Sequence, residues 1–294
     1  MPFELIEVPC GLGLLPTGVD RASAELLAAG LADRLSARGV RTVGCVPASD
    51  TRDPETGMLR PHELVVMAVR LADAVEAVRD SGSIPVVIGG DCSNVLGSML
   101  ALRRRGTYGL LYVDGHADFW HPTQDELGEA ASVDLALATG RGPELLTGIE
   151  GRGPLVRDEH VAVLGYRSEV NDDYLGEHVR DTGIFVAGLE DLRESGLEGC
   201  TARALDRVAS PDLDGFWLHV DVDVLDDEIM PAVDYRERGG LTWDEAESIL
   251  TAALATGRVT GVQVTIYNPA LDEPGAPLAG RIVDLLAAAL TARR

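Results

Sequence analysis

The chain is poor in aromatic residues and in positive charge. Only 4% of its 294 residues are Phe, Trp or Tyr, and 25 Lys and Arg stand against 48 Asp and Glu, which gives a formal net charge of −23. Aromatic platforms and basic patches are the surfaces with which proteins hold nucleic acids, so their scarcity argues against a nucleic-acid partner. The excess of acid favours a soluble surface, attraction of cations, or carboxylates that hold metal ions.

The sequence also lacks segments for membrane insertion or export. Its apolar stretches are shorter than the roughly 20 residues that span a bilayer. The first residues, MPFELIEVPCGLG, contain an early acid and no basic start followed by an apolar run, as a secretory signal would have. No CxxC pair or dense disulfide framework is present, so we expect a cytoplasmic protein with no membrane partner. The four cysteines are widely separated: Cys10, Cys45, Cys92 and Cys200.

Short β-rich runs alternate with longer amphipathic segments, a pattern that indicates a mostly parallel sheet with helices on both faces. We therefore expect residues 1–294 to form one three-layer α/β/α domain. At Thr242 and Glu245 the spacing predicts a capping box that starts a helix. The predicted strands are 3–8, 40–46, 84–90, 108–114, 161–166, 184–188, 216–224 and 261–267, and the predicted helices are 24–39, 61–80, 94–104, 242–257 and 278–293.

Three of the predicted buried strands end in acidic residues. IPVVIGG runs into Asp91-Cys92, YGLLYV into the segment 114–118 (DGHAD), and FWLHV into 221–223 (DVD). Ligands of parallel sheets bind outside the carboxyl ends of the strands, so five carboxylates, one imidazole and one thiol are expected to meet there. Like charges at short range repel and resist burial, and divalent cations offset that repulsion. Oxygen ligands with one imidazole suit Mn²⁺ better than a structural zinc cage.

The spacing of the last segment adds to this expectation. Asp221 and Asp223 are two residues apart on a predicted strand, so they should point to the same face, which His219 shares. The alternative for any single aspartate at a strand end is that it caps the following turn or helix.

In order, the three segments resemble motifs of the arginase/agmatinase (ureohydrolase) family, whose members carry GGDH, DxHxD and SxDxDxxDP on an α/β/α fold. The resemblance implies a metal pair, two Mn²⁺ per chain, and a homo-oligomer that is a trimer or a hexamer. One ion would take Cys92, Asp114, Asp118 and Asp221, and the other Asp114, His116, Asp221 and Asp223. The matching segments are Gly89-Gly90-Asp91-Cys92, then Asp114 to Asp118, then His219 to Asp223 with Asp226, followed by Pro231 and Gly239-Gly240-Leu241-Thr242.

The reaction implied by the resemblance is hydrolysis of a C–N bond in a guanidino or amidine compound. A hydroxide that bridges the two metals would attack the planar carbon, since two cations lower the pKa of bound water. Asp118 would orient that hydroxide as well as bind metal.

Cys92 departs from the family pattern, because it stands where the family has its first histidine ligand. A thiolate is softer than imidazole and carries charge, which would tilt the selectivity of that site from Mn²⁺ towards Zn²⁺ or Fe²⁺. The alternative is that Cys92 stays a buried thiol and one metal is weakly bound or absent.

The substrate side departs further. Trp120 stands where the family has an asparagine, and residues 131–135 (ASVDL) cover a turn that has lost its histidine. Ile266 replaces the glutamate that holds the guanidinium, which removes a contact worth about 1.5–3 kcal/mol. A modified guanidine, an N-hydroxyguanidine or a different amidine is therefore a more plausible substrate than arginine or agmatine.

Other side chains could replace the lost ones. Glu129 is a candidate carboxylate for the substrate, and Ser132 is a candidate contact beside Trp120 and Ile266. His121 and His219 are candidate proton shuttles, which makes them catalytic candidates together with Asp118. The structural alternatives are a solvated loop acid for Glu129, packing beside Phe119-Trp120 for His121, and a place behind the metal ligands for His219.

Two further functions stay open at this point. The chain could be a binding or regulatory protein that kept the fold and lost turnover, which the changes at Cys92, Ala131 and Ile266 favour. It could also be a structural oligomer subunit whose metals serve stability alone.

Overall fold

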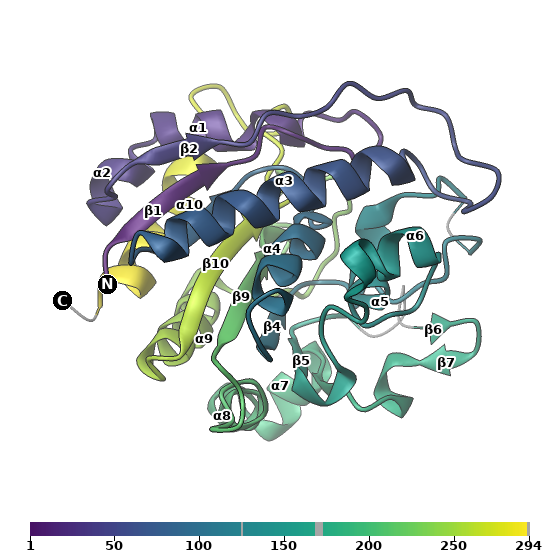
Figure 1. Cartoon of the computed structure of the whole chain (residues 1–294). Coiled ribbons are helices and arrows are strands. Elements are labelled where there is room, and N and C mark those ends of the chain that lie inside the picture. Colours follow the sequence, from purple (N-terminus) through teal and green to yellow (C-terminus); the bar gives the residue numbers. More distant parts are fainter. Residues whose placement is uncertain (125, 168–172, 293–294) are drawn as a thin grey trace.

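The computed structural model describes residues 1–124, 126–167 and 173–292, and it is built around one sheet (Figure 1). The sheet has eight strands in the order β2-β1-β3-β10-β9-β4-β5-β8, and each neighbouring pair is parallel. A separate antiparallel pair joins β6 (Asp173–Tyr174) to β7 (Glu177–His178). The strands of the main sheet are β1 (Phe3–Glu7), β2 (Val40–Thr42), β3 (Ile84–Ile88), β4 (Gly109–Val113), β5 (Val161–Leu164), β8 (Phe185–Ala187), β9 (Phe216–Asp221) and β10 (Val259–Thr265).

Helices cover both faces of the sheet, which confirms the predicted three-layer α/β/α architecture (Figure 1). Successive strand residues point to opposite faces. In β4, Leu110 and Tyr112 therefore belong to one core, whereas Leu111 and Val113 belong to the other. The first core is completed by α3 (Pro61–Asp80), α4 (Asn94–Arg103), α5 (Asp134–Ala138) and α6 (Glu144–Thr147). The second is completed by α1 (Ala22–Ala28), α2 (Leu31–Leu35), α7 (Leu189–Ser195), α8 (Leu197–Val208), α9 (Trp243–Ala255) and α10 (Pro277–Thr291).

Local sequence explains where two of the longer helices begin. Pro61 occupies the first turn of α3, where a missing N–H costs nothing. Thr242 caps α9 and forms the predicted capping box with Glu245, because the Thr242 side chain accepts from the Glu245 N–H and the Glu245 carboxylate accepts from the Thr242 N–H. Both helices therefore start at the residues that the sequence indicates.

Three predicted elements are wrong in extent. The helix predicted over 24–39 is two short helices, because the chain breaks at Gly30, whose φ of 93° lies in the left-handed region. The strand predicted over 40–46 ends at Thr42. The strand predicted over 216–224 ends at Asp221, and residues Val222–Val224 form a 3₁₀ turn.

Cys10 and Cys45 form a disulfide that links the segment after β1 to the segment after β2. The wide spacing of the cysteines in the sequence did not predict this pair, because residues 35 apart are brought together only by the parallel pairing of the two strands. Among the described residues, no helix is long and apolar enough to cross a membrane.

Candidate metal centre

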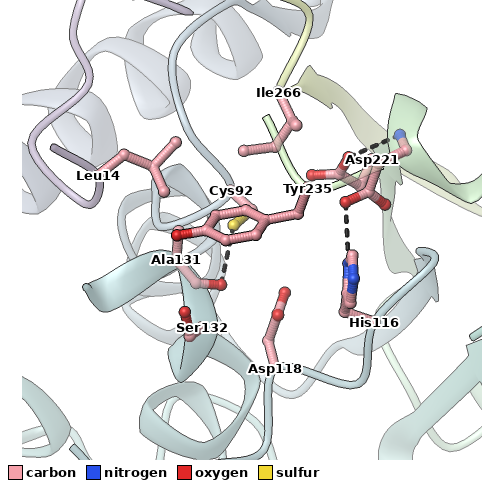
Figure 2. Close-up of a pocket in the computed structure, with 10 residues that line it drawn as sticks. Leu14, Cys92, His116, Asp118, Ala131, Ser132, Asp221, Tyr235 and Ile266 are labelled. Carbon is pink, nitrogen blue, oxygen red and sulfur yellow. Dashed lines mark hydrogen bonds and ion pairs between the residues drawn. The ribbon is translucent and has the colours of Figure 1, made fainter. Parts of the chain in front are cut away.

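The acidic segments meet at the carboxyl-terminal edge of the sheet. Cys92 follows β3, the segment 114–118 follows β4, and Asp221 ends β9. These strands lie in the middle of the sheet and are parallel, so their ends face the same side. Between them lies an inner cavity of about 40 Å³, shown in Figure 2. Its lining consists of Leu14, Cys92, His116, Asp118, Ala131, Ser132, Asp221, Asp223, Tyr235 and Ile266.

His116 and Asp223 line the inner cavity, and together with Asp114 they offer ligand atoms within 4.8 Å of one another. The His116 Nδ1 lies 2.9 Å from Asp223 Oδ2, and the His116 backbone N–H donates to Asp114 Oδ1 at 2.7 Å. The sequence suggested that Asp223 lies on the strand with Asp221, but the strand ends at Asp221. The 3₁₀ turn after β9 carries Asp223 to this position beside His116, and the Asp223 N–H donates to Asp221 Oδ1 at 2.9 Å.

His116 and Asp223 stabilise each other's charged form. Burial acts to lower the pKa of His116, but the neighbouring Asp223 carboxylate outweighs burial and raises that pKa to about 12. Burial acts to raise the pKa of Asp223, and the His116 imidazolium outweighs it, so that pKa lies below its ordinary value. In the protein without metal, the positive charge of protonated His116 therefore offsets part of the negative charge of the carboxylates, as a bound cation would.

For the remaining carboxylates, burial outweighs the neighbouring groups that favour ionisation, among them His116 beside Asp114. Burial, reinforced by neighbouring carboxylates, raises the pKa values of Asp114, Asp118 and Asp221 well above their ordinary range. Asp114 Oδ2 is buried and has no hydrogen-bond partner in the part of the chain that the structure describes. Buried polar atoms without partners are costly, and a cation at this place would satisfy them. Carboxylate oxygens and one imidazole are ligands that divalent metals accept, so these residues fit a metal site.

His219 lies behind these ligands. Its ring is fully buried, stacks on Tyr112 with the ring centroids 4.2 Å apart, and places Nε2 3.4 Å from Asp114 Oδ2. Trp217 Nε1–H donates to Gln263 Oε1 at 2.9 Å, which turns the Gln263 amide nitrogen to His219 Nδ1 at 2.7 Å. The Gln263 amide can only donate there, so Nδ1 accepts and the neutral ring carries its proton on Nε2, towards Asp114.

Cys92 lies at the other side of the inner cavity. Its thiol is buried, donates to the Ala131 carbonyl at 3.2 Å, and has a pKa raised well above the ordinary value, chiefly by burial. Its sulfur lies within 4.8 Å of ligand atoms of Asp118 and Asp134. The sequence had indicated Asp114 and Asp221 as its companions at the first metal, and it did not single out Asp134.

Two aspartates of the acidic segments serve the backbone instead. Asp91 was expected among the converging carboxylates, but it accepts hydrogen bonds from the N–H groups of Gly13 and Ser93 at 3.0 Å each. Asp226 accepts from the N–H groups of Gly239 and Gly240. For these two residues, the alternative that a strand-end aspartate caps a turn is the one that the structure supports.

One side of the inner cavity is apolar, and the Tyr235 side chain, which is 47% exposed, is part of the lining. Figure 2 shows Leu14 and Ala131 facing Asp221 and His116 across the cavity, with the Tyr235 ring between them. Ile266 completes the wall and has a φ of 71°, a left-handed conformation that is rare for a β-branched residue.

The other predicted substrate contacts lie at different depths. Glu129 is buried, so it is not a solvated loop acid; its carboxylate accepts from the Tyr235 hydroxyl at 2.6 Å and the Leu15 N–H at 2.7 Å. Ser132 lines both the inner cavity and an outer cavity of about 550 Å³, and Trp120 lines only the outer one. His121 is absent from the described lining of both cavities; its ring contacts Tyr174 edge-on, and its Nδ1 lies 2.7 Å from the Thr123 hydroxyl.

Sequence reasoning missed several residues of this site. Tyr235 and Glu237 line the outer cavity, and the Glu237 carboxylate lies 3.7 Å from His116 Nε2. Gln263 is a buried polar residue inside the predicted strand 261–267, and Asp134 is a buried carboxylate in the segment 131–135, for which a turn was expected. A polar residue in an apolar run or a turn does not specify a partner.

Residues 2–292 match the sequence profile of the Arginase family. The chain belongs to the arginase family. An arginase from Bacillus caldovelox is 28% identical over 279 residues, which cover 92% of each chain, and one from Staphylococcus aureus is 26% identical over 278 residues, covering 92% of this chain and 91% of that one.

Solved structures agree with this assignment. The native structure of the arginase from Bacillus caldovelox superposes with a TM-score of 0.87 at 25% identity over 98% of each chain. An agmatine ureohydrolase from Thermoplasma volcanium has a TM-score of 0.71 at 17% identity and covers 99% of this chain and 89% of that one, which shows the shared fold. In the arginase family, then, this chain keeps buried residue groups that can hold metal.

Proposed function

We propose that this protein is a hydrolase that depends on a pair of divalent metals and cleaves a C–N bond of a guanidino or amidine compound. Membership of the arginase family and the buried ligand groups support a metal-dependent hydrolase. The observation that carries the proposal is the gathering of Asp114, Asp118 and Asp221, whose ionised forms are destabilised by burial until cations are bound.

The chemistry divides between the metals and the chain. Two bound cations, with Mn²⁺ as the expected metal, would lower the pKa of a water held between them and would polarise the substrate. Asp114, His116, Asp221 and Asp223 hold their positions through backbone N–H groups and through one another. Asp118 lines the cavity, and its Oδ2 lies 2.5 Å from the Tyr112 hydroxyl, which fixes the carboxylate that would orient the attacking water.

The walls of the inner cavity support an atypical substrate. Leu14, Ala131 and Ile266 are apolar, and the Tyr235 side chain lines the same cavity. Glu129, a buried carboxylate that contacts Tyr235, already accepts from the Tyr235 hydroxyl and from a backbone N–H. The apolar lining of this side would suit a substituted guanidine or another amidine that packs an apolar group there better than a simple guanidinium.

His121 and His219 stay candidates for moving protons, but they differ in burial and in their distance from the metal ligands. His219 is fully buried and contacts Asp114, so its geometry suits orientation of that carboxylate better than exchange with solvent. His121 lies near Trp120 in the loop that borders the outer cavity. A homo-oligomer, a trimer or a hexamer, and a cytoplasmic location also stay predictions; the Cys10–Cys45 disulfide is unusual for a reducing compartment.

The proposal is tested by loading metal-stripped protein with Mn²⁺, Zn²⁺ or Fe²⁺ and measuring urea or amine release from a panel of guanidino and amidine compounds. Asp221→Ala should lose both bound metal and activity, because Asp221 is expected to contact both ions. Asp73→Ala is the control, since that carboxylate is 67% exposed on α3. Retained activity in Asp221→Ala would contradict the mechanism. A wild-type protein that binds metal but turns over none of the compounds would favour the regulatory alternative.

A further inference from the structure

Asp134 is a buried carboxylate that none of the expected metal sites uses. It is the first residue of α5 and is fully buried. Its carboxylate lies within 4.8 Å of the Cys92 sulfur and of an Asp118 oxygen, and these two also lie within 4.8 Å of each other. Separations of this size place three ligand atoms around a point that one metal ion can occupy, given metal–sulfur and metal–oxygen distances of about 2.0–2.3 Å.

The hydrogen bonds of this group are incomplete. Asp134 Oδ1 accepts from the Tyr112 hydroxyl at 2.7 Å, and the Cys92 thiol approaches the carboxylate closely enough to favour its ionised form. Oδ2 is buried and has no hydrogen bond of ordinary geometry among residues 1–124, 126–167 and 173–292. The same Tyr112 hydroxyl lies 2.5 Å from Asp118 Oδ2, and its single proton cannot serve both carboxylates. A buried carboxylate oxygen without a donor calls for a positive partner.

Among the described residues, three groups of side chains bring ligand atoms within 4.8 Å of one another, and Cys92 belongs to a different group from Asp114. Asp114 groups with His116 and Asp223, and again with His219 and Asp221, whereas Cys92 groups only with Asp118 and Asp134. The thiol and the Asp134 carboxylate therefore form a corner of the site that differs from the ligand set expected for the first ion.

We propose that Cys92, Asp118 and Asp134 hold the first metal ion of this protein, with Asp134 as a ligand in its own right, and that the ion there is Zn²⁺ or a similar borderline-soft cation. A thiolate with two carboxylates is a more anionic and softer set than imidazole with carboxylates, which favours Zn²⁺ over Mn²⁺. The inference rests on the proposed function, because this ion is one of the two that the hydrolase would use.

The test compares the wild type with Asp134→Asn. Asparagine keeps an oxygen acceptor for the Tyr112 hydroxyl but replaces Oδ2 by an amide that does not bind metal. The matched control is Asp272→Asn, because Asp272 also accepts a tyrosine hydroxyl, that of Tyr267 at 2.7 Å, outside the metal groups of the described chain. Metal-stripped proteins are titrated with Zn²⁺, Mn²⁺ and Co²⁺, bound ions are counted by elemental analysis, and the thiolate-to-cobalt absorption band reports on Cys92.

The proposal expects two Zn²⁺ per chain in the wild type and in Asp272→Asn, and about one in Asp134→Asn, with Zn²⁺ affinity at the lost site at least about tenfold weaker and a lost or shifted cobalt band. Unchanged stoichiometry, affinity and band in Asp134→Asn would overturn it. If that variant does not fold, anomalous scattering from Zn²⁺-loaded wild-type crystals decides, because an ion must lie between the Cys92 sulfur and Asp134. If the crystals hold ions only at Asp114, His116, Asp221 and Asp223, this inference is wrong and the proposed hydrolase function is unaffected. If the crystals hold no ion at all, both proposals are wrong.

Discussion

The protonated His116 makes the metal-free protein sensitive to alkaline pH. Its pKa is about 12 in the folded chain and 6.5 for an ordinary histidine. Because the folded-state value is the higher one, the stability that this proton provides is complete below pH 6.5 and is lost as pH rises towards 12. One pH unit in that window corresponds to about 1.36 kcal/mol, so the rise from pH 6.5 to 8.5 should cost about 2.7 kcal/mol of unfolding free energy.

Other groups of the site titrate alongside His116. Burial raises the pKa values of Asp114, Asp118 and Asp221 well above their ordinary range, so their ionisation as pH rises costs stability in the same direction as the loss of the His116 proton. The pKa of Asp134 is raised by burial to about 7, so its effect has the same sign and ends near that pH. The pKa of His219 is lowered by burial to about 4, so its opposite effect lies between pH 4 and 6.5 and is finished before the window begins. The loss is large against a typical total stability of about 5–15 kcal/mol.

Urea unfolding of chelator-treated protein at pH 6.5, 7.5 and 8.5 measures the effect, with His116→Gln as the control that should make the slope shallower by the share that His116 contributes. Saturating divalent metal should remove it as well, because a ligating imidazole must give up its proton. A metal-free wild type that is equally or more stable at pH 8.5 than at pH 6.5 would refute the His116–Asp223 ion pair as the charge balance of the site.

Three further substitutions test separate parts of the structure. Cys92→His should raise Mn²⁺ content per chain, because imidazole replaces a thiolate; an unchanged metal content would mean that position 92 holds no ion. Ile266→Glu should raise kcat/KM for arginine or agmatine by about 10- to 150-fold, the equivalent of the missing 1.5–3 kcal/mol contact, and no gain at equal metal content would contradict that role of the side chain. Thr242→Ala should lower the unfolding free energy of the metal-loaded protein by about 1 kcal/mol through loss of the α9 cap, with activity unchanged; an unaltered urea midpoint would speak against the capping box.

The sequence predicted the layers of the fold because periodicity decides them. Alternating strands and helices left a parallel sheet as the simplest solution, and α3 begins and ends at the predicted residues 61 and 80. The helix predicted over 24–39 failed at Gly30, since the apolar spacing continues through a glycine whose left-handed backbone ends the first helix. Hydrophobic pattern alone does not reveal such a break.

The site was predictable where ligands follow strands and not where loops fold back. Asp114 and Asp221 come directly after buried strands, so their meeting follows from the sheet. Asp91 has the same sequence setting, yet the Gly13 N–H from a distant loop takes up its carboxylate. Asp134 contacts the Tyr112 hydroxyl, and Tyr235 contacts Glu129, more than a hundred residues earlier in the chain; the sequence offers no local indication of either contact.

The order of the strands has a consequence for synthesis of the chain. In the sheet, β10 and β9 separate β3 from β4, although both are made more than a hundred residues after them. During synthesis, β3 and β4, which precede the segments that bear Cys92 and Asp118, therefore each keep one unpaired edge until the last quarter of the polypeptide has been made. Before that insertion a nascent chain lacks Asp221 and Asp223, two of the proposed metal ligands, and truncated forms should be prone to aggregate through those open edges.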